Sequence, residues 1–351
     1  MIKKFNYFIL SLLYPIPKKI RKIKQNQLTK ITFGNNSYNV YTISSSRIYT
    51  DTINFCGVLQ NNELLDGPSY QIINNNFLDI KKNIILKIGT PRLKKILKGP
   101  IFVLLTGGGG NSNYFHWLFD VLPRLKLIEK SIKENKIKYF LFPSLHEEFQ
   151  QKTIKILKIP KPKCLSSRQF RHIESNKIIM TSHPYVFSKN SKNDSQKIPK
   201  WISLWLKEKF LPYKSKKKFF KKIFIDRKFS ESAHQGRSIT NKEEVTSLLK
   251  KEGFKSIFLE DYTFEEKIAI FNKANIIVGL HGAAFANIVF CKKGVKIIEI
   301  LNKKTGNQFR NLALTNNLNY FPIFGKSKIQ VSDQQGNIKV SLKRLNKVLH
   351  K

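Results

Sequence analysis

Three polar residues of this chain recur at four-residue steps, namely His116, Asp120 and Arg124. Residues four apart lie along one face of an α-helix, and Asn113 stands about one turn earlier on the same predicted helix. An imidazole beside a carboxylate is suited to general base chemistry, because the carboxylate orients the ring and stabilises the imidazolium that forms when a hydroxyl is deprotonated. The spacing therefore predicts a proton-accepting pair, with His116 and Asp120 as candidate catalytic residues.

The sequence leaves two alternatives to this prediction open. Asp120 itself is a candidate base, with His116 then positioning the ligand, and a His–Asp pair on an ordinary helix surface has the same spacing without a catalytic role. Pro123 lacks an N–H and is expected to bend or end the helix between Asp120 and Arg124. The run Gly107–Gly110 before the helix does not match G-x-G-x-x-G, and it predicts either a flexible loop or a turn that brings free helix N–H groups to a ligand.

A second segment, Ile276–Phe290, predicts a buried strand followed by a turn of small residues. Glycine and alanine let backbone N–H groups approach a ligand, and the start of a helix favours a negatively charged diphosphate. Gly279, Gly282 and Ala283 would supply that close approach, and His281 is expected at the strand end beside the phosphates or a sugar. Tight packing of the strand against the helix explains the same small residues without a ligand.

Two charged residues belong to the same predicted sheet. Arg227 directly follows the strand Ile223–Asp226, so its guanidinium is expected at the sheet edge, where a fixed cation can meet a diphosphate. Glu299 interrupts an apolar strand and needs a partner, which is either a nucleotide ribose or an internal Lys or Arg. Asn241 with Glu244 three residues later predicts a capped helix start.

The elements around these residues alternate between strand and helix from residue 100 onward. We expect strands over 101–105, 139–142, 177–180, 223–225, 256–259, 276–278 and 295–300, and helices over 113–132, 147–157, 201–210, 241–252 and 264–274. Strand-like pieces near 38–44 and 84–88 precede them. This alternation predicts an α/β fold with a parallel sheet covered on both faces, in which ligands bind at the carboxyl ends of the strands.

A basic run at 213–222 predicts the boundary between two domains. We therefore expect an apolar and basic N-terminal segment over 1–24, a first domain over 25–212, a second domain over 213–325 and a tail over 326–351. The apolar stretch Phe5–Pro17 is too short to span a bilayer. Its flanking lysines predict either an interfacial membrane anchor or a first helix docked on the body of the protein.

The composition narrows the class of protein. The 351 residues are 41% hydrophobic, which is ample for a core, and the three cysteines do not form a disulfide framework, which favours a reducing, cytoplasmic location. The 64 Lys and Arg against 23 Asp and Glu give a net charge of +41, which predicts attraction to an anionic membrane, an anionic substrate or nucleic acid. Only ten of these cations are Arg, the residue that base recognition prefers, so nucleic acid is the less favoured partner.

Together these segments resemble the glycosyltransferase 61 family, whose bacterial members are often labelled capsular polysaccharide biosynthesis proteins. The resemblance covers roughly residues 100 to 324. Its motifs, in chain order, are Asn113-Tyr-Phe-His-Trp-Leu-Phe-Asp120, Leu122-Pro-Arg-Leu125, Arg227, Arg237 with Asn241, Val278–Phe290 and Ile297-Ile-Glu-Ile300.

The resemblance implies a GT-B-like architecture, in which two Rossmann-like domains face each other across a cleft. It also implies inverting sugar transfer from a nucleotide-sugar donor to a hydroxyl of a glycan or lipid-linked glycan. The second domain would hold the donor, and the first would present the acceptor near Asn113, Trp117 and Arg124. The implied donor-binding residues are Arg227, Arg237, Gly279, His281, Gly282, Ala283, Asn287 and Glu299.

No cofactor is expected besides the nucleotide-sugar substrate. The sequence contains no Asp-x-Asp pair, so no metal ion is expected, and backbone amides with Arg227 would carry the leaving diphosphate. Two other functions stay open from the sequence, a basic nucleic-acid-binding protein and a non-catalytic partner in polysaccharide assembly.

Overall fold

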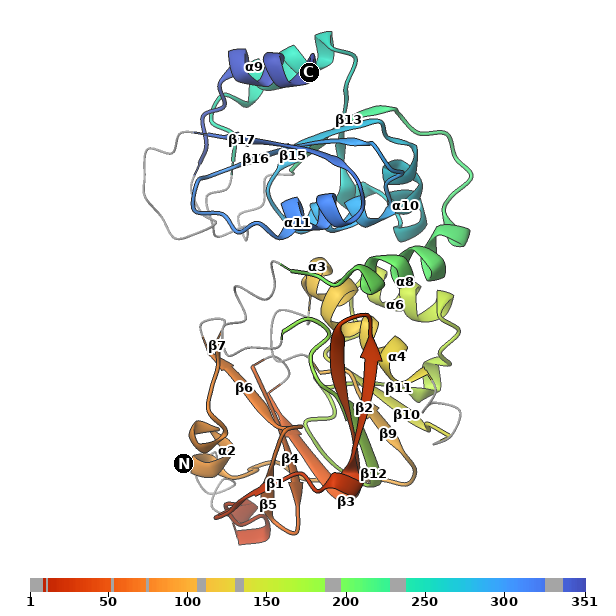
Figure 1. The fold of residues 1–351 in the computed structure, drawn as a ribbon. Helices are drawn as coiled ribbons and strands as arrows, with labels where there is room; N and C mark the ends of the chain where they lie inside the picture. The colour runs from red at the N-terminus through yellow and green to blue at the C-terminus, as the bar shows by residue number, and fades with distance from the viewer. Residues whose placement is uncertain are drawn as a thin grey trace. The chain divides into compact units, whose positions relative to one another are not determined.

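The computed structural model describes residues 9–10, 12–51, 54–73, 76–105, 112–129, 136–186, 197–227, 238–325 and 337–351. The chain forms two compact units, Met1–Ser195 and Gln196–Lys351. Each unit has a sheet and a hydrophobic core of its own (Figure 1). In the part of the chain that is described, no helix is both long and apolar enough to cross a bilayer.

The sheet of the first unit combines antiparallel and parallel pairs. Its main path runs β1-β5-β4-β3-β12-β9-β10-β11, with β2 beside β3, β6 beside β4 and β7, and β8 beside β12. The strands are β1 (Ile20–Lys22), β2 (Leu28–Phe33), β3 (Asn36–Thr50), β4 (Phe55–Gln60), β5 (Glu63–Asp66), β6 (Tyr70–Ile73), β7 (Asn76–Phe77), β8 (Lys95–Leu97), β9 (Ile101–Val103), β10 (Tyr139–Phe142), β11 (Cys164–Ser166) and β12 (His172–Thr181).

Short turns make the early strands antiparallel, because a parallel pair needs a long crossover. Asn61 and Asn62 both have positive φ, 51° and 56°, which is the turn chemistry that joins β4 to β5 as a hairpin. Each neighbouring pair in the row β12, β9, β10 and β11 is parallel. Helices connect β9 to β10 and β10 to β11, as in an α/β layer. The expected Rossmann-like parallel pattern therefore occupies only this side of the first sheet.

The helices of the first unit are α2 (Ile85–Ile88), α3 (Tyr114–His116), α4 (Pro123–Leu127) and α6 (Glu148–Ile156), with a π-helical turn, η4 (Trp117–Val121), between α3 and α4. The strand expected near 84–88 is wrong, since this segment is α2. Short apolar runs do not distinguish a strand from a helical turn. Here the Asn83 side chain accepts a hydrogen bond from Ile85 N (3.1 Å), and Gly89, with φ 63°, ends the turn.

The second unit has a five-stranded sheet in which every pair of neighbours is parallel. Its order is β14-β13-β15-β16-β17, from β13 (Lys222–Asp226), β14 (Lys255–Phe258), β15 (Ile276–Leu280), β16 (Lys296–Leu301) and β17 (Asn319–Phe324). Numbered within the unit this is 2-1-3-4-5, a doubly wound order. The chain leaves β13 to one side and returns on the other as β15, so the carboxyl ends of β13 and β15 form the switch point where such sheets bind ligands.

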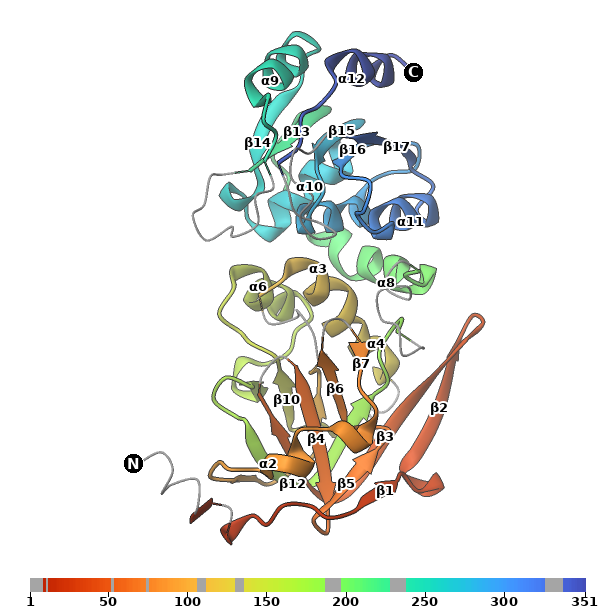
Figure 2. The ribbon, with the colours of Figure 1, turned by 90° about the vertical axis from the view of Figure 1, so that its left-hand side faces the viewer.

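Helices cover both faces of this second sheet (Figure 2). They are α8 (Lys200–Phe210), α9 (Lys242–Lys251), α10 (Phe264–Lys273), α11 (Gln308–Thr315) and α12 (Leu342–Leu349), with a 3-10 helix, η8 (Ala283–Phe290). On one face, α9 and α12 pack Val245, Leu249 and Leu345 onto the strands. On the other face, α10 and α11 both contact η8 (Figure 2).

The division of the chain lies earlier than the boundary expected at residue 213. Helix α8 belongs to the second unit, because it packs against η8, and Asn316 donates a hydrogen bond to Ser203 on α8 (3.2 Å). The tail expected over 326–351 is also part of this unit where it is described. There, Ile338 pairs with Ile239, and α12 packs on α9.

Candidate active site

His116 sits at the end of a short helix that leaves the sheet after β9. The helix begins at Asn113, whose side-chain oxygen accepts hydrogen bonds from the backbone N–H groups of Phe115 (3.0 Å) and His116 (3.4 Å). Asn113 is therefore a capping residue that fixes where the helix starts. The next turn widens to a π-helix, in which Leu122 N bonds to Trp117 O (3.1 Å). Pro123 has no N–H to continue an α-helical pattern, and π turns of this kind recur at functional sites.

The predicted His116–Asp120 pair is present in the structure. His116 Nδ1 lies 2.7 Å from Asp120 Oδ2, with the carboxylate buried and the imidazole 32% exposed. An ionised carboxylate only accepts hydrogen bonds, so Nδ1 carries the proton and Nε2 keeps its lone pair. Burial disfavours a charged ring, but the charge and hydrogen bond of Asp120 favour it more, and the pKa of His116 is raised. The pair thus presents a basic nitrogen, Nε2, on a partly exposed ring.

Two residues that the sequence did not indicate also hold Asp120. Tyr185 donates a short hydrogen bond to Asp120 Oδ1, and His183 Nε2 lies 3.6 Å from Oδ2. His183 Nδ1 accepts the backbone N–H groups of Tyr185 (3.3 Å) and Val186 (3.1 Å), so the proton of His183 is on Nε2 and faces the carboxylate. Burial alone would raise the pKa of Asp120, but His116 and His183 hold it far below its usual range.

Sheet topology explains why these residues meet. Strands β9 and β12 are parallel, so the chain leaves both at the same edge of the sheet, toward His116 in one case and toward His183 in the other. The available sequence signal was the strand expected over 177–180, whose carboxyl end precedes His183 by a few residues. Combined with the rule that ligands bind at such ends, it indicates this region but does not single out Tyr185.

Arg124 and Trp117, expected beside an acceptor, are both buried in the first unit. Arg124 Nε donates to Asp120 O (3.0 Å) and its Nη1 donates to Thr181 O (3.0 Å), so it ties the helix to the end of β12. Trp117 donates from Nε1 to Thr153 Oγ1 (2.9 Å) and is fully buried. Both residues therefore fix the position of the helix that carries His116, Trp117 through Thr153 and Arg124 through Thr181.

A hollow of about 210 Å³ borders this cluster at Arg124 and His183. It is lined by Gly67, Pro68, Ser69, Tyr70, Phe77, Arg124, Thr181, Ser182, His183 and Val186. The hydroxyl of Tyr70 is buried, and no described residue forms a hydrogen bond with it. A hydroxyl-rich ligand would satisfy such a group, since a buried donor without a partner is costly. His183 thus borders Asp120 with one nitrogen and contributes to a polar hollow.

In the second unit, Arg227 lies at the switch point, immediately after β13. Its Nη2 donates a short hydrogen bond to His281 O, the first residue after β15. A Cβ on Gly282 would lie only 2.0 Å from this Nη2, so the guanidinium occupies the space that a side chain at position 282 would need. The predicted juxtaposition of Arg227 and Gly282 is therefore present, and it places a cation beside backbone at the sheet edge.

His281 and Glu299 pair with each other inside the second unit. His281 Nδ1 lies 2.5 Å from Glu299 Oε1, and the Tyr320 hydroxyl donates to Glu299 Oε2 (2.5 Å). Gln308 Nε2 lies 3.2 Å from His281 Nε2, and both His281 and Glu299 are buried. Glu299 thus has two partners, the imidazole of His281 and the phenol of Tyr320. From the sequence, a ribose or an internal Lys or Arg was expected instead. The expectation placed His281 beside phosphates, but its ring is engaged on both nitrogens.

The remaining predicted residues of this segment serve packing or begin η8. A Cβ on Gly279 would lie 3.0 Å from Phe285 and 3.2 Å from Ile225, so tight packing requires glycine there. Asn287 is buried and donates to Ala284 O (3.0 Å). Ala283 is half-buried at the first position of η8. Arg237 and the run at 107–110 lie outside the described residues.

The capped helix start at Asn241 differs from the expectation. Helix α9 does begin after Asn241, but the amide of this side chain bonds to both backbone groups of Val340, accepting from N (2.9 Å) and donating to O (3.0 Å). Asn241 Nδ2 also lies 3.2 Å from Glu244 Oε2.

Within the described ranges, no three His, Cys, Asp or Glu side chains are grouped to hold a metal ion.

A family model described as Glycosyltransferase 61 matches residues 114–298, which is more than half of the 351-residue chain. The matched span starts at α3 and ends within β16, so it contains His116 with Asp120 and Arg227 with Gly282. No curated protein matches the chain.

Proposed function

Since this chain belongs to the glycosyltransferase 61 family, we propose that it is an inverting glycosyltransferase of surface polysaccharide biosynthesis, of the bacterial capsular type. It would move a sugar from a nucleotide-sugar donor to a hydroxyl of a glycan or lipid-linked glycan. Family membership supports sugar transfer in general. The observation that carries the finer proposal is the basic Nε2 of His116, presented on a ring that buried Asp120 holds from the opposite nitrogen.

The proposed step uses His116 as general base. Nε2 accepts the proton of the acceptor hydroxyl while the hydroxyl oxygen attacks the anomeric carbon of the donor sugar. The bond from that carbon to the nucleoside diphosphate breaks on the opposite face, so the configuration at the carbon inverts. The negative charge of Asp120 stabilises the imidazolium that forms, and base catalysis of this kind contributes roughly 10²–10⁴-fold to a rate. Tyr185 and His183 keep the carboxylate in place.

We place the donor diphosphate at the switch point of the second unit. Support comes from the guanidinium of Arg227 beside the backbone of Gly282, at the edge where doubly wound sheets bind ligands. In this proposal Arg227 and nearby amides neutralise the leaving diphosphate without a metal ion. The two units would face each other across a cleft in the GT-B manner, so that His116 reaches the sugar held by the second unit.

The acceptor would bind on the first unit, with its reacting hydroxyl at Nε2 of His116 and a further part of the glycan in the hollow beside His183. The hollow supports this placement, because the hydroxyl of Tyr70 and the side chains of Thr181 and Ser182 offer hydrogen bonds that suit sugar hydroxyls. The free thiols of the chain fit a reducing compartment, which supports a cytoplasmic location at the inner face of the membrane.

The test separates chemistry from donor binding. His116→Ala should lower turnover by about 10²-fold or more, because it removes the base. The thermal shift produced by a nucleoside diphosphate should persist, since Arg227 belongs to the other unit. The matched control is His146→Ala, which removes an exposed imidazole from the same unit. Equal loss of turnover and of nucleotide affinity would indicate that His116 binds the donor. Unchanged turnover would refute its role as base.

A further inference from the structure

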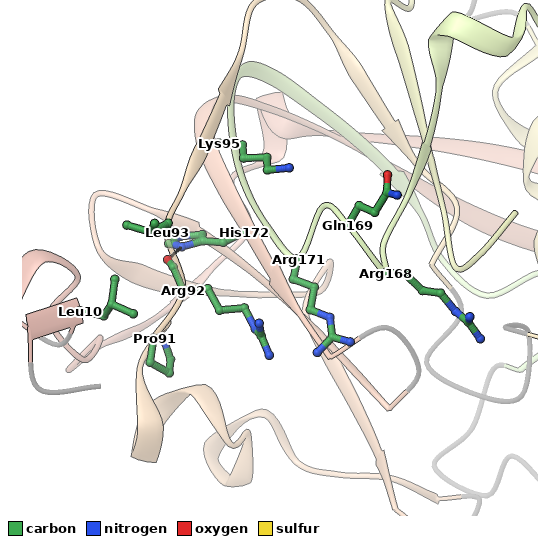
Figure 3. Close-up of a pocket in the computed structure, with 9 residues that line it drawn as sticks. All are labelled: Leu10, Pro91, Arg92, Leu93, Lys95, Arg168, Gln169, Arg171 and His172. Atoms are coloured by element: carbon green, nitrogen blue, oxygen red, sulfur yellow. Dashed lines mark hydrogen bonds between the residues drawn. The ribbon is translucent and has the colours of Figure 1, made fainter. Parts of the chain in front are cut away.

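A second hollow, of about 340 Å³, lies on the first unit away from the His116 cluster. It forms where the segment before β8 meets the turn between β11 and β12 (Figure 3). Its lining is Leu10, Pro91, Arg92, Leu93, Lys95, Arg168, Gln169, Arg171 and His172. Four of these nine residues are cations and none is an acid, so the hollow carries a concentrated positive charge.

Among the described residues, the arginines of this hollow have no acidic partner. The described residues include no ion pair to Arg92, Arg168 or Arg171, whereas the neighbouring Lys94 pairs with Glu174. Arg171 is half-buried, and its Nε is a buried donor for which the described part of the chain offers no hydrogen-bond partner. In Figure 3 the guanidinium groups of Arg92 and Arg171 extend to the same side. Arginine forks match phosphate oxygens, and a bound phosphate would relieve both the repulsion and the unsatisfied donor.

One exposed leucine lines the hollow, and two more lie in the N-terminal segment that reaches it. Leu93 lines it and is 74% exposed, and Leu12 and Leu13 follow Leu10 in the N-terminal segment, exposed by 67% and 60%. Tyr14 attaches this segment beside the hollow. Its hydroxyl accepts a hydrogen bond from Lys94 N (3.2 Å), and its ring packs edge-on against His172 with centroids 4.9 Å apart. Leu93 is therefore exposed beside the arginines, and Leu12 and Leu13 are exposed in the segment that Leu10 and Tyr14 bring to the hollow.

We propose that this hollow and the leucines around it, the basic apolar surface, bind an anionic phospholipid bilayer. Lipid phosphates lie between Arg92 and Arg171, and Leu12, Leu13 and Leu93 enter the boundary between headgroups and acyl chains. Charge complementarity selects an anionic lipid, and the exposed leucines select a bilayer over nucleic acid, which offers no apolar phase to receive them. The proposed surface lies apart from the His116 cluster. The test of membrane binding is therefore independent of whether the protein transfers sugars.

The test measures co-sedimentation of the full chain with vesicles at about 0.1 M salt, where charges interact over roughly 10 Å. Vesicles of phosphatidylglycerol with phosphatidylcholine should bind the protein, and vesicles of phosphatidylcholine alone should bind it weakly. The double variant Arg92→Gln/Arg168→Gln removes two exposed cations. It should partition about thirty-fold more weakly, since each cation near such a surface adds about 1 kcal/mol. The matched control, Lys161→Gln/Lys163→Gln, removes the same charge from exposed positions of the same unit.

A second pair of variants tests the leucines. Leu12→Ser/Leu13→Ser should abolish the part of the binding that survives at high salt, because that part depends on apolar contact. Leu204→Ser/Leu314→Ser, which changes two exposed leucines of the second unit, should leave it intact. Melting temperatures of all variants would show that each remains folded.

Three outcomes would overturn the proposal. Equal weakening by the two cation doubles would indicate general attraction by the net charge. Tight, steeply salt-dependent binding to duplex DNA with no binding to vesicles would assign the cations to nucleic acid. Stabilisation by inorganic phosphate that depends on Arg92 and Arg168, again without vesicle binding, would identify a site for a soluble phosphate.

Discussion

Replacement of Asp120 by Asn removes the negative charge beside the proposed base, His116, and changes little else. The side chain keeps its size, and its oxygen can still accept from His116 Nδ1, now 2.7 Å from Asp120 Oδ2. The Tyr185 hydroxyl can turn from donor to acceptor, so the buried contact is retained. A hydrogen bond to a charged group contributes about 1.5–3 kcal/mol. At about 1.4 kcal/mol for each factor of ten, Asp120→Asn should lower kcat by about 10- to 150-fold.

The same substitution should move the pH dependence of the rate. A general base must be neutral to accept a proton, so the rate rises as pH increases through the pKa of His116. Burial lowers that pKa, but Asp120 raises it more, so the acidic limb of the wild-type profile should lie above the ordinary value of about 6.5. Asparagine carries no charge to favour the imidazolium. The limb of Asp120→Asn should therefore shift to lower pH.

The assay follows release of nucleoside diphosphate from the nucleotide sugar that the wild-type protein uses best, over about pH 5 to 9, with acceptor present. Glu129→Gln is the control, because it removes a carboxylate that pairs with Lys126 on the surface of the first unit. An acidic limb at the same pH in both proteins, with unchanged kcat, would refute the coupling of Asp120 to the base. Near-complete loss of activity in Asp120→Asn, with no acidic limb in the wild-type profile over this range, would instead assign the base to Asp120, whose pKa lies far below it.

Three further substitutions test the second unit. Gly282→Ala should weaken nucleoside diphosphate binding about tenfold with little loss of stability, because the new Cβ displaces the flexible end of the Arg227 side chain. Titration by thermal shift measures both the affinity and the stability. Glu299→Ala should lower the free energy of unfolding by about 3 kcal/mol or more in urea, since it leaves His281 buried without its carboxylate, and a loss below about 1 kcal/mol would contradict this. Gly279→Ala should destabilise the same unit by about 1–3 kcal/mol in urea unfolding without changing nucleotide affinity in the stable fraction, because its Cβ meets the core.

The secondary structure of the second half was largely predictable. The helices expected over 201–210, 241–252 and 264–274 are α8, α9 and α10, and the expected strands correspond to β13 through β16. Hydrophobic periodicity is a local property, so it carries this information without knowledge of the fold. The early strands were less predictable because they are hairpins of a mixed sheet, in which turn residues such as Asn61 and Asn62 decide the pairing.

The His116–Asp120 pair was predictable for the same reason. Four residues separate the two side chains, and helical geometry alone brings them together. The partners of Asp120 were not predictable in this way. Tyr185 is 65 residues away, and it reaches the carboxylate only because β12 and β9 are neighbouring parallel strands. In the same manner, Glu299 needed a partner by its burial, but β16 lying beside β15 decided that the partner is His281.

The sequence by itself determined the local features of this protein, namely the strand and helix segments, the acid–imidazole pair and the doubly wound half that carries Arg227. Tertiary structure alone decided which groups satisfy a buried charge, as in the hydrogen bond from buried Arg124 to the carbonyl of Thr181. It also decided where cations gather that have no acidic partner among the described residues, as in Arg92 and Arg171 of the basic apolar surface. The physical reason is that side-chain charge and hydrogen-bonding capacity can be recognised in a sequence, but whether they are satisfied depends on contacts between segments far apart in the chain.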